Sequence, residues 1–217
     1  MTASEIILLV LEIIGTVAFA ISGAFVAIKA KLDVFGVVFV GCVTAVGGGI
    51  TRDLLIGQTP PAIFGNLYIL LIAAVTSVGV FVVAHLTHRR FVVGYEKFEP
   101  TQNVFDAFGL AAFTVMGTEI AFIHGLSDNA FLAILLGMLT GVGGGVFRDV
   151  LISTTPYIFK KHIYALASIA GAVVYYLLRI FVDGTLVASL VAMAVVVVLR
   201  LLAAKYRWSL PKVNLEE

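Results

Sequence analysis

Two copies of one motif place polar and charged residues inside long apolar runs. Both copies have the pattern GGGxxRDxLIxxTP; the first begins at Gly47 and the second at Gly143. A glycine inside a helix costs roughly 1 kcal/mol relative to alanine, and a charge at mid-membrane costs about 2.5–3.5 kcal/mol. Because this cost occurs twice, the motif indicates a functional site. The candidate site residues are Gly47, Gly48, Gly49, Arg52, Asp53, Gly143, Gly144, Gly145, Arg148 and Asp149.

The chemistry that these glycines favour is transient binding of a cation. We expect the helices to kink or unwind near Gly48 and Gly144, because glycine tolerates unusual dihedral angles. Unwinding would free carbonyl oxygens from Thr44 and Thr140 onward, and such oxygens are cation ligands. Non-helical backbone at this depth persists only where it is buried or faces water. Thr44 and Thr140 are therefore secondary candidates for an ion pathway.

The Arg-Asp pairs need partners elsewhere in the fold. Neighbouring residues on a helix diverge by about 100°, so Arg52 and Asp53 are not expected to pair with each other. We expect contacts between the two halves of the protein instead, with a purely structural ionic network as the alternative. Glu119 lies deep in its apolar run and is a further candidate, whereas Glu12 and Asp106 are predicted to be interfacial groups.

The composition is that of an integral membrane protein. Of the 217 residues, 61% are hydrophobic and 12% charged, and the mean hydropathy is +1.10, which is too apolar for a soluble domain. A net charge of +1 gives no nucleic-acid footprint, and the single cysteine, Cys42, permits no internal disulfide. Neither metal-ligand spacing nor a catalytic motif is present in the sequence. We therefore expect neither an enzyme nor a cofactor.

Seven runs are long enough to cross a bilayer as helices, and together they predict a single all-α membrane domain. The flanking sequence extends the duplication beyond the motif, since Gly15–Gly23 parallels Gly109–Gly117. Repeat one is expected at about 6–84 and repeat two at about 105–182. Because each repeat has three spans, the repeats are inverted in the membrane. The predicted spans are roughly 6–28, 34–56, 67–84, 105–123, 130–152, 163–182 and, outside the repeats, 186–202.

The basic residues between the spans predict the orientation. Eleven of the 14 Lys and Arg fall on one side, two lie in the motifs, and only Arg179 falls on the other side. Positive loops are retained in the cytoplasm. The C-terminus is thus expected to be cytoplasmic and the N-terminus outside. The eleven are Lys29, Lys31, Arg89, Arg90, Lys97, Lys160, Lys161, Arg200, Lys205, Arg207 and Lys212.

The duplicated GGGxxRD motif in spans two and five, the inverted repeats and the seventh span resemble the trimeric intracellular cation channel (TRIC) family, in its prokaryotic branch. The resemblance covers about residues 6–202. It implies a homotrimer in the inner (cell) membrane of a prokaryote. It further implies a pore in each protomer, lined around glycine-kinked helices two and five, that conducts monovalent cations such as sodium and, preferentially, potassium. The small residues Gly15, Gly23, Gly109 and Gly117 are expected to allow close helix approach in the trimer.

Two function classes remain open. The bacterial relatives also carry an older label as glycine transporters, so a secondary transporter of a small amino acid is the alternative to a channel. A channel needs weak binding along a wet path, whereas a transporter needs alternating access to one site. Deep acids that could couple protons are few, which favours the channel. A membrane protein without transport fits the polar interior poorly.

Overall fold

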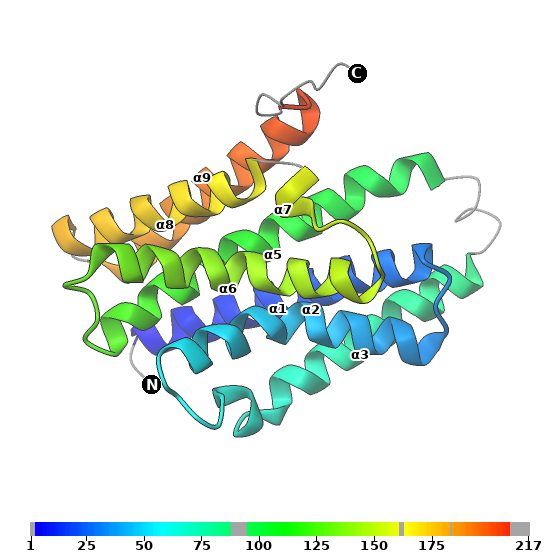
Figure 1. The fold of residues 1–217 in the computed structure, drawn as a ribbon, viewed down its shortest axis with the longest axis horizontal. Coiled ribbons are helices and arrows are strands. Elements are labelled where there is room, and N and C mark those ends of the chain that lie inside the picture. Colours follow the sequence, from blue (N-terminus) through cyan, green and yellow to red (C-terminus); the bar gives the residue numbers. More distant parts are fainter. Residues whose placement is uncertain (1–2, 88–94, 161–162, 183, 209–217) are drawn as a thin grey trace, which may run out of the picture.

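The computed structural model of the 217-residue chain describes residues 3–87, 95–160, 163–182 and 184–208 (Figure 1). The predicted orientation also used Arg89, Arg90, Lys161 and Lys212, which lie outside the described residues. Within the described part of the chain, all regular structure is helical. The predicted all-α class is therefore confirmed.

Seven of the described helices are long and apolar enough to span a membrane. Their bounds match the predicted spans closely, apart from a helix that starts at Tyr95, ahead of the predicted span at 105. The two short helices that follow the repeated motifs were not predicted. The long helices are α1 (Ala3–Lys29), α2 (Val34–Leu55), α3 (Leu67–Leu86), α5 (Tyr95–Ile123), α6 (Ala130–Leu151), α8 (Ile163–Phe181) and α9 (Thr185–Lys205); the short ones are η1 (Ala62–Phe64) and α7 (Tyr157–Lys160).

The motif-bearing helices α2 and α6 begin in the same way. The Asp33 side chain accepts a hydrogen bond from the Gly36 backbone N–H at 2.8 Å, and the Asn129 side chain accepts one from the Leu132 N–H at 3.1 Å. Such caps satisfy N–H groups that the first turn of a helix leaves open. Each capping residue precedes its glycine triplet by 14 residues, from 33 to 47 and from 129 to 143. The two helices therefore present their motifs at the same height along the helix.

The helices form two three-helix bundles that are related as inverted repeats. Helices α1, α2 and α3 pack together as one bundle, and α5, α6 and α8 form the other (Figure 1). Contacts of α1 with α5 and of α2 with α6 join the bundles, and α9 packs on α5 and α8. In the membrane span of the central helix α5, 78% of the residues in its apolar window are buried and the mean hydropathy is the lowest of the spans, 1.4; in peripheral α3 the corresponding values are 22% and 2.6. Polar residues thus concentrate in the span that the other helices shield from lipid.

The glycine triplets do not unwind their helices, so this part of the prediction is wrong. Helix α2 is continuous from Val34 to Leu55, and α6 is continuous from Ala130 to Leu151. The triplets instead allow the two backbones to touch: a Cβ atom at Gly48 would collide with the Thr140 carbonyl oxygen. A Cβ atom at Gly144 would collide in the same way with the Thr44 carbonyl oxygen. Close packing is therefore the physical reason for glycine at the crossing of α2 and α6.

The four glycines predicted to assist trimer formation also serve contacts within the protomer. A Cβ atom at Gly15 would lie 3.0 Å from the Phe113 ring, and one at Gly109 would collide with the Phe19 ring, so both lie between α1 and α5. Gly23 faces α2, and Gly117 faces α6. Because these positions are filled by the protomer itself, they are not a surface for another subunit, and that part of the prediction is wrong.

Candidate functional site

In both motifs the arginine binds the aspartate that follows it. Arg52 donates from Nε and Nη2 to Asp53 Oδ1 at 2.9 and 2.7 Å, and Arg148 Nε donates to Asp149 Oδ1 at 2.8 Å. The prediction that sequence neighbours on a helix do not pair is wrong here. A guanidinium at the end of a long flexible stem can bend around the helix circumference, which short side chains cannot do. The predicted contact between the two halves is made by Arg148 with the Ser22 hydroxyl of the first repeat. Among the described residues, neither arginine binds a carboxylate of the other repeat.

The second oxygen of each aspartate anchors the chain after the helix. Asp53 Oδ2 accepts from the Ala62 N–H at 2.9 Å, at the start of η1, and Asp149 Oδ2 accepts from the Tyr157 N–H at 2.8 Å, at the start of α7. Each aspartate thus links its arginine to the segment beyond the Thr-Pro pair of the motif. This anchoring role was not predicted from the sequence, although the repeated LIxxTP portion is its signal.

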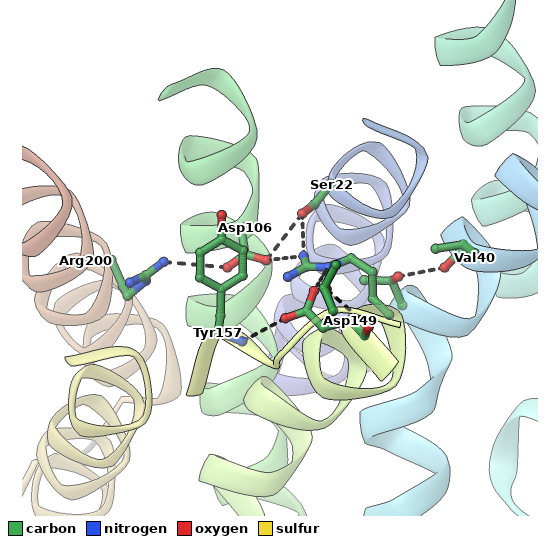
Figure 2. A network of polar contacts seen from close by, with 9 residues as sticks. Ser22, Val40, Asp106, Asp149, Tyr157 and Arg200 are labelled. Atoms are coloured by element: carbon green, nitrogen blue, oxygen red, sulfur yellow. Dashed lines mark hydrogen bonds and ion pairs between the residues drawn. The ribbon is translucent and has the colours of Figure 1, made fainter. Parts of the chain in front are cut away.

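In the second repeat the Arg-Asp pair belongs to a closed ionic cluster (Figure 2). Arg148 is 0% exposed, and its Nη1 donates to Asp106 Oδ1 on α5 at 2.6 Å and to Ser22 Oγ on α1 at 2.8 Å. Ser22 also donates to Asp106 Oδ1, at 3.2 Å. The prediction that Asp106 is an interfacial group is wrong, because its carboxylate is buried against Arg148.

The seventh spanning helix, α9, adds a second arginine to this cluster (Figure 2). Arg200 Nη2 lies 3.8 Å from Asp106 Oδ2, and its guanidinium stacks over the Tyr164 ring at 4.5 Å. Arg200 was predicted only as one of the basic residues that set the orientation, since nothing in the repeat pattern connects α9 with the motif. Four fully buried atoms here have no hydrogen-bond partner among the described residues: Asp106 Oδ2, Arg148 Nη2, Tyr164 Oη and Arg200 Nε.

In the first repeat the matching region remains open. Glu12 occupies the position that Asp106 occupies in the second repeat, but its carboxylate accepts a hydrogen bond from Tyr68 on α3, at 3.1 Å. The Arg52 side chain has Asp53 as its acidic partner among the described residues. A cavity of about 50 Å³ lies beside this pair. Its polar lining residues are Glu12, Thr16, Arg52, Asp53 and Asn66.

The remaining candidate residues lie apart from the two Arg-Asp pairs. Thr44 and Thr140 are buried, and each hydroxyl donates to its own helix, to Val40 O and Leu136 O, both at 2.6 Å. Their carbonyls face the opposing glycines at the crossing.

Glu119 forms a third polar site, between α5 and α8. Its carboxylate accepts from Tyr175 Oη at 2.9 Å and from Arg179 Nε and Nη2 at 2.9 and 3.0 Å.

Together these contacts give one charged cavity in the first repeat and one closed ionic cluster in the second, with the glycine crossing of α2 and α6 between the bundles. Charged side chains inside membrane spans are costly and mark pathways or ionic networks. Among the residues that the structure describes, no group of three or more His, Cys, Asp or Glu could hold a metal ion.

Comparison with known proteins places this arrangement in a family. A family model described as "Glycine transporter" matches residues 9–85 and 103–179, one segment in each repeat. The UPF0126 inner membrane protein YadS of Escherichia coli K12 is 36% identical over 213 residues, which covers 95% of this chain and 96% of YadS.

Solved structures agree with this assignment over the same length. A prokaryotic TRIC channel crystallised in 0.5 M KCl superposes with a TM-score of 0.85 and 34% identity, covering 95% of this chain and 100% of that one. A TRIC trimeric intracellular cation channel orthologue from Rhodobacter sphaeroides gives a TM-score of 0.81 and 30% identity, covering 93% and 98%. The chain is therefore a multi-pass membrane protein that belongs to the prokaryotic branch of the TRIC family.

Proposed function

We propose that this protein is a cation channel that conducts monovalent cations and prefers potassium over sodium. The observation that carries the proposal is the match over almost the whole chain to prokaryotic TRIC cation channels, at a TM-score of up to 0.85. The charged groups buried inside its spans support transport rather than catalysis, because such groups in membrane helices mark ion pathways.

The proposed pathway runs within each protomer along the junction of the two bundles. It passes the glycine triplets of both motifs and lies between the Arg52–Asp53 pair and the Arg148–Asp149 pair. Thr44, Thr140 and Glu119 are secondary candidates along it. Because the backbones of α2 and α6 touch at Gly48 and Gly144, we infer that the present conformation is closed at the crossing. Conduction then requires the two helices to separate there.

The proposed assembly is a homotrimer in the inner membrane of a prokaryote. The Rhodobacter sphaeroides relative is described as trimeric, and large apolar side chains remain exposed at the starts of α2 and α6, Phe35 at 73% and Phe131 at 74%. A native mass measurement in mild detergent should give three copies of the chain. A stable monomer or dimer would contradict this assembly.

The proposed orientation has the N-terminus outside and the C-terminus in the cytoplasm. Cysteines introduced at Thr2 and Asn214, in a Cys42→Ala background, should react with an impermeant thiol reagent from opposite sides of oriented vesicles. Labelling of both positions from one side would contradict an odd number of spans.

Recording in planar bilayers tests the channel proposal directly. Purified protein should give discrete current steps in KCl, and the reversal potential between KCl and NaCl solutions should show a preference for potassium. Arg52→Gln should change the conductance, and more so at low salt, because a shorter screening length at high ionic strength weakens the field of a charge on nearby ions. Silent membranes containing folded, reconstituted protein would refute the proposal.

A transporter of glycine is the second candidate, because the matching family model carries that description. Uptake of labelled glycine into vesicles separates the two candidates. Saturable uptake without current steps would favour the transporter, whereas current steps without uptake would favour the channel.

A further inference from the structure

The cavity of the first repeat is lined by more acidic than basic side chains. Its lining contains two acids, Glu12 and Asp53, and one base, Arg52. The Arg52 guanidinium is already bound to Asp53 by two hydrogen bonds to one carboxylate oxygen, so these two charges compensate each other locally. The Glu12 carboxylate is left without a cationic partner within salt-bridge distance among the described residues, and its Oε1 accepts no hydrogen bond there. A single positive charge would balance the cavity.

An unsatisfied hydroxyl lies in the wall of the same cavity. Thr16 is 0% exposed, and its Oγ1 has no hydrogen-bond partner among the residues that the structure describes. Other buried hydroxyls in the spans, such as those of Thr44 and Thr140, donate to the carbonyl four residues earlier; Thr16 does not. Because Glu12 and Thr16 are four residues apart on α1, they share one face of the helix. A buried hydroxyl without a partner costs free energy unless something in the cavity binds it.

The second repeat has different side chains at the positions that match Glu12 and Thr16. At the positions that match Glu12 and Thr16 it has Asp106 and Leu110, which are both buried. Asp106 neutralises Arg148 there, and Leu110 offers no polar atom. The second repeat also has an unsatisfied buried hydroxyl, that of Tyr164, but the acid beside it, Asp106, is paired with arginines. A carboxylate without a cationic partner next to an unsatisfied hydroxyl is therefore found, among the described residues, beside the cavity of the first repeat.

We propose that this cavity is a binding site for one partly dehydrated monovalent cation. Its ligands are the Glu12 carboxylate, the Thr16 hydroxyl and the amide oxygen of Asn66, whose side chain also lines the cavity and makes no cap hydrogen bond to α3. Oxygen atoms of these kinds suit hard cations. A cavity volume of roughly 10–15 Å³ suffices for one water molecule. A cavity of about 50 Å³ therefore accommodates a cation together with water.

The physiological role of this site rests on the proposed channel function. Binding of an ion to the site can nevertheless be measured without recording a current. One test is crystallography of the wild-type protein in thallium(I) nitrate, where anomalous scattering locates a potassium-like ion. A peak between Glu12 and Thr16 is expected. A second test follows thermal unfolding of the purified protein as KCl replaces N-methyl-D-glucamine chloride at constant ionic strength.

The variants Glu12→Gln and Thr16→Val test the assigned ligands. Glu12→Gln removes the compensating charge and should weaken the potassium-dependent stabilisation by about ten-fold in apparent Kd, the effect of losing roughly one close charge interaction. Thr16→Val keeps the shape of the side chain but removes its hydroxyl, and it should weaken the potassium-dependent stabilisation less than Glu12→Gln does. Asp128→Asn removes one negative charge at an exposed position in the loop after α5, away from the cavity. It should leave the potassium-dependent stabilisation unchanged.

The outcomes distinguish the site from the channel function. Wild-type crystals without a thallium peak in the cavity, or equal potassium dependence in Glu12→Gln and Asp128→Asn, would overturn the site even if the protein conducts. A peak that disappears in Glu12→Gln would support the site even if no current is found, and the channel proposal alone would then fail. Stabilisation by glycine but not by potassium would overturn the cation assignment and identify a zwitterion as the occupant.

Discussion

The same motif is closed around Arg148 and open around Arg52. Both arginines bind the next aspartate, and both aspartates anchor the segment after the helix. Arg148, however, also binds a second acid, Asp106, and is fully buried, whereas Arg52 lies beside a cavity. The duplicated motif thus provides the local anchor, while residues outside it decide whether the surrounding space is filled.

Two differences outside the motif account for this contrast. Asp106 reaches Arg148, but Glu12 at the matching position binds Tyr68 on α3 instead. In addition, α9 has no counterpart in the first repeat and brings Arg200 against Asp106 and Tyr164. In the second repeat the buried charges on α5, α6 and α9 thus neutralise one another. In the first repeat the Glu12 carboxylate keeps no cationic partner among the described residues.

The largest expected effect comes from removing the arginine of the closed cluster. Arg148→Gln leaves two buried carboxylates, Asp106 and Asp149, without their strongest partner, and should destabilise the protein by about 3–5 kcal/mol. Arg52→Gln leaves one carboxylate beside a cavity and should cost about 1–3 kcal/mol. Thermal unfolding of the two purified variants in the same detergent measures the difference.

A charge-balanced double variant provides the control for this comparison. Arg148→Gln combined with Asp106→Asn removes one charge of each sign and should recover part of the lost stability. Equal losses for the Arg148 and Arg52 single variants would show that the two repeats are equivalent in energy, contrary to their different burial.

The glycine crossing gives the next largest effect. Gly48→Ala and Gly144→Ala each place a Cβ atom against a carbonyl oxygen of the opposite helix, and such overpacking costs about 1–3 kcal/mol. Gly79→Ala on α3 is the matched control, because a Cβ atom there meets nothing within 4 Å. It should stabilise the helix slightly, by up to about 1 kcal/mol. Similar melting temperatures for all three variants would contradict direct backbone contact between α2 and α6.

Much of the fold could be predicted from the sequence because membrane spans are defined by length and apolar composition alone. The inverted repeats followed from the duplicated motif and the odd number of spans in each repeat. The state of the glycine triplets could not be predicted, since a glycine permits both an unwound helix and a close contact. Only the position of the opposing helix, with the Thr140 carbonyl against Gly48, decides between the two.

The candidate site could be predicted only in part, because its contacts also depend on how the helices pack. The motif residues themselves were identified, but their partners lie on other helices, and a single sequence does not state which helices touch. Asp106 and Ser22 meet Arg148 through the packing of α5 and α1 against α6. Arg200 belongs to a helix without a repeat partner, so no internal symmetry pointed to it. The cavity is likewise a feature of packing between helices.

The smallest loss of stability is expected on replacing Glu119, whose ion pair is found in the second repeat and is partly exposed to solvent. Glu119 binds Arg179 in the second repeat, whereas the position in the first repeat that matches Glu119 carries Phe25. The Arg179 side chain is 24% exposed, so water partly replaces the pair when it is broken, and Tyr175 can donate its hydrogen bond to an amide oxygen as well. Glu119→Gln should therefore cost at most about 1 kcal/mol, and the cost should shrink at high salt. Thermal unfolding at low and high NaCl measures both quantities. A loss of stability as large as that of Arg148→Gln, and unchanged by salt, would show that Glu119 and Arg179 form a second closed cluster. The difference between the repeats would then extend beyond the Arg-Asp motifs.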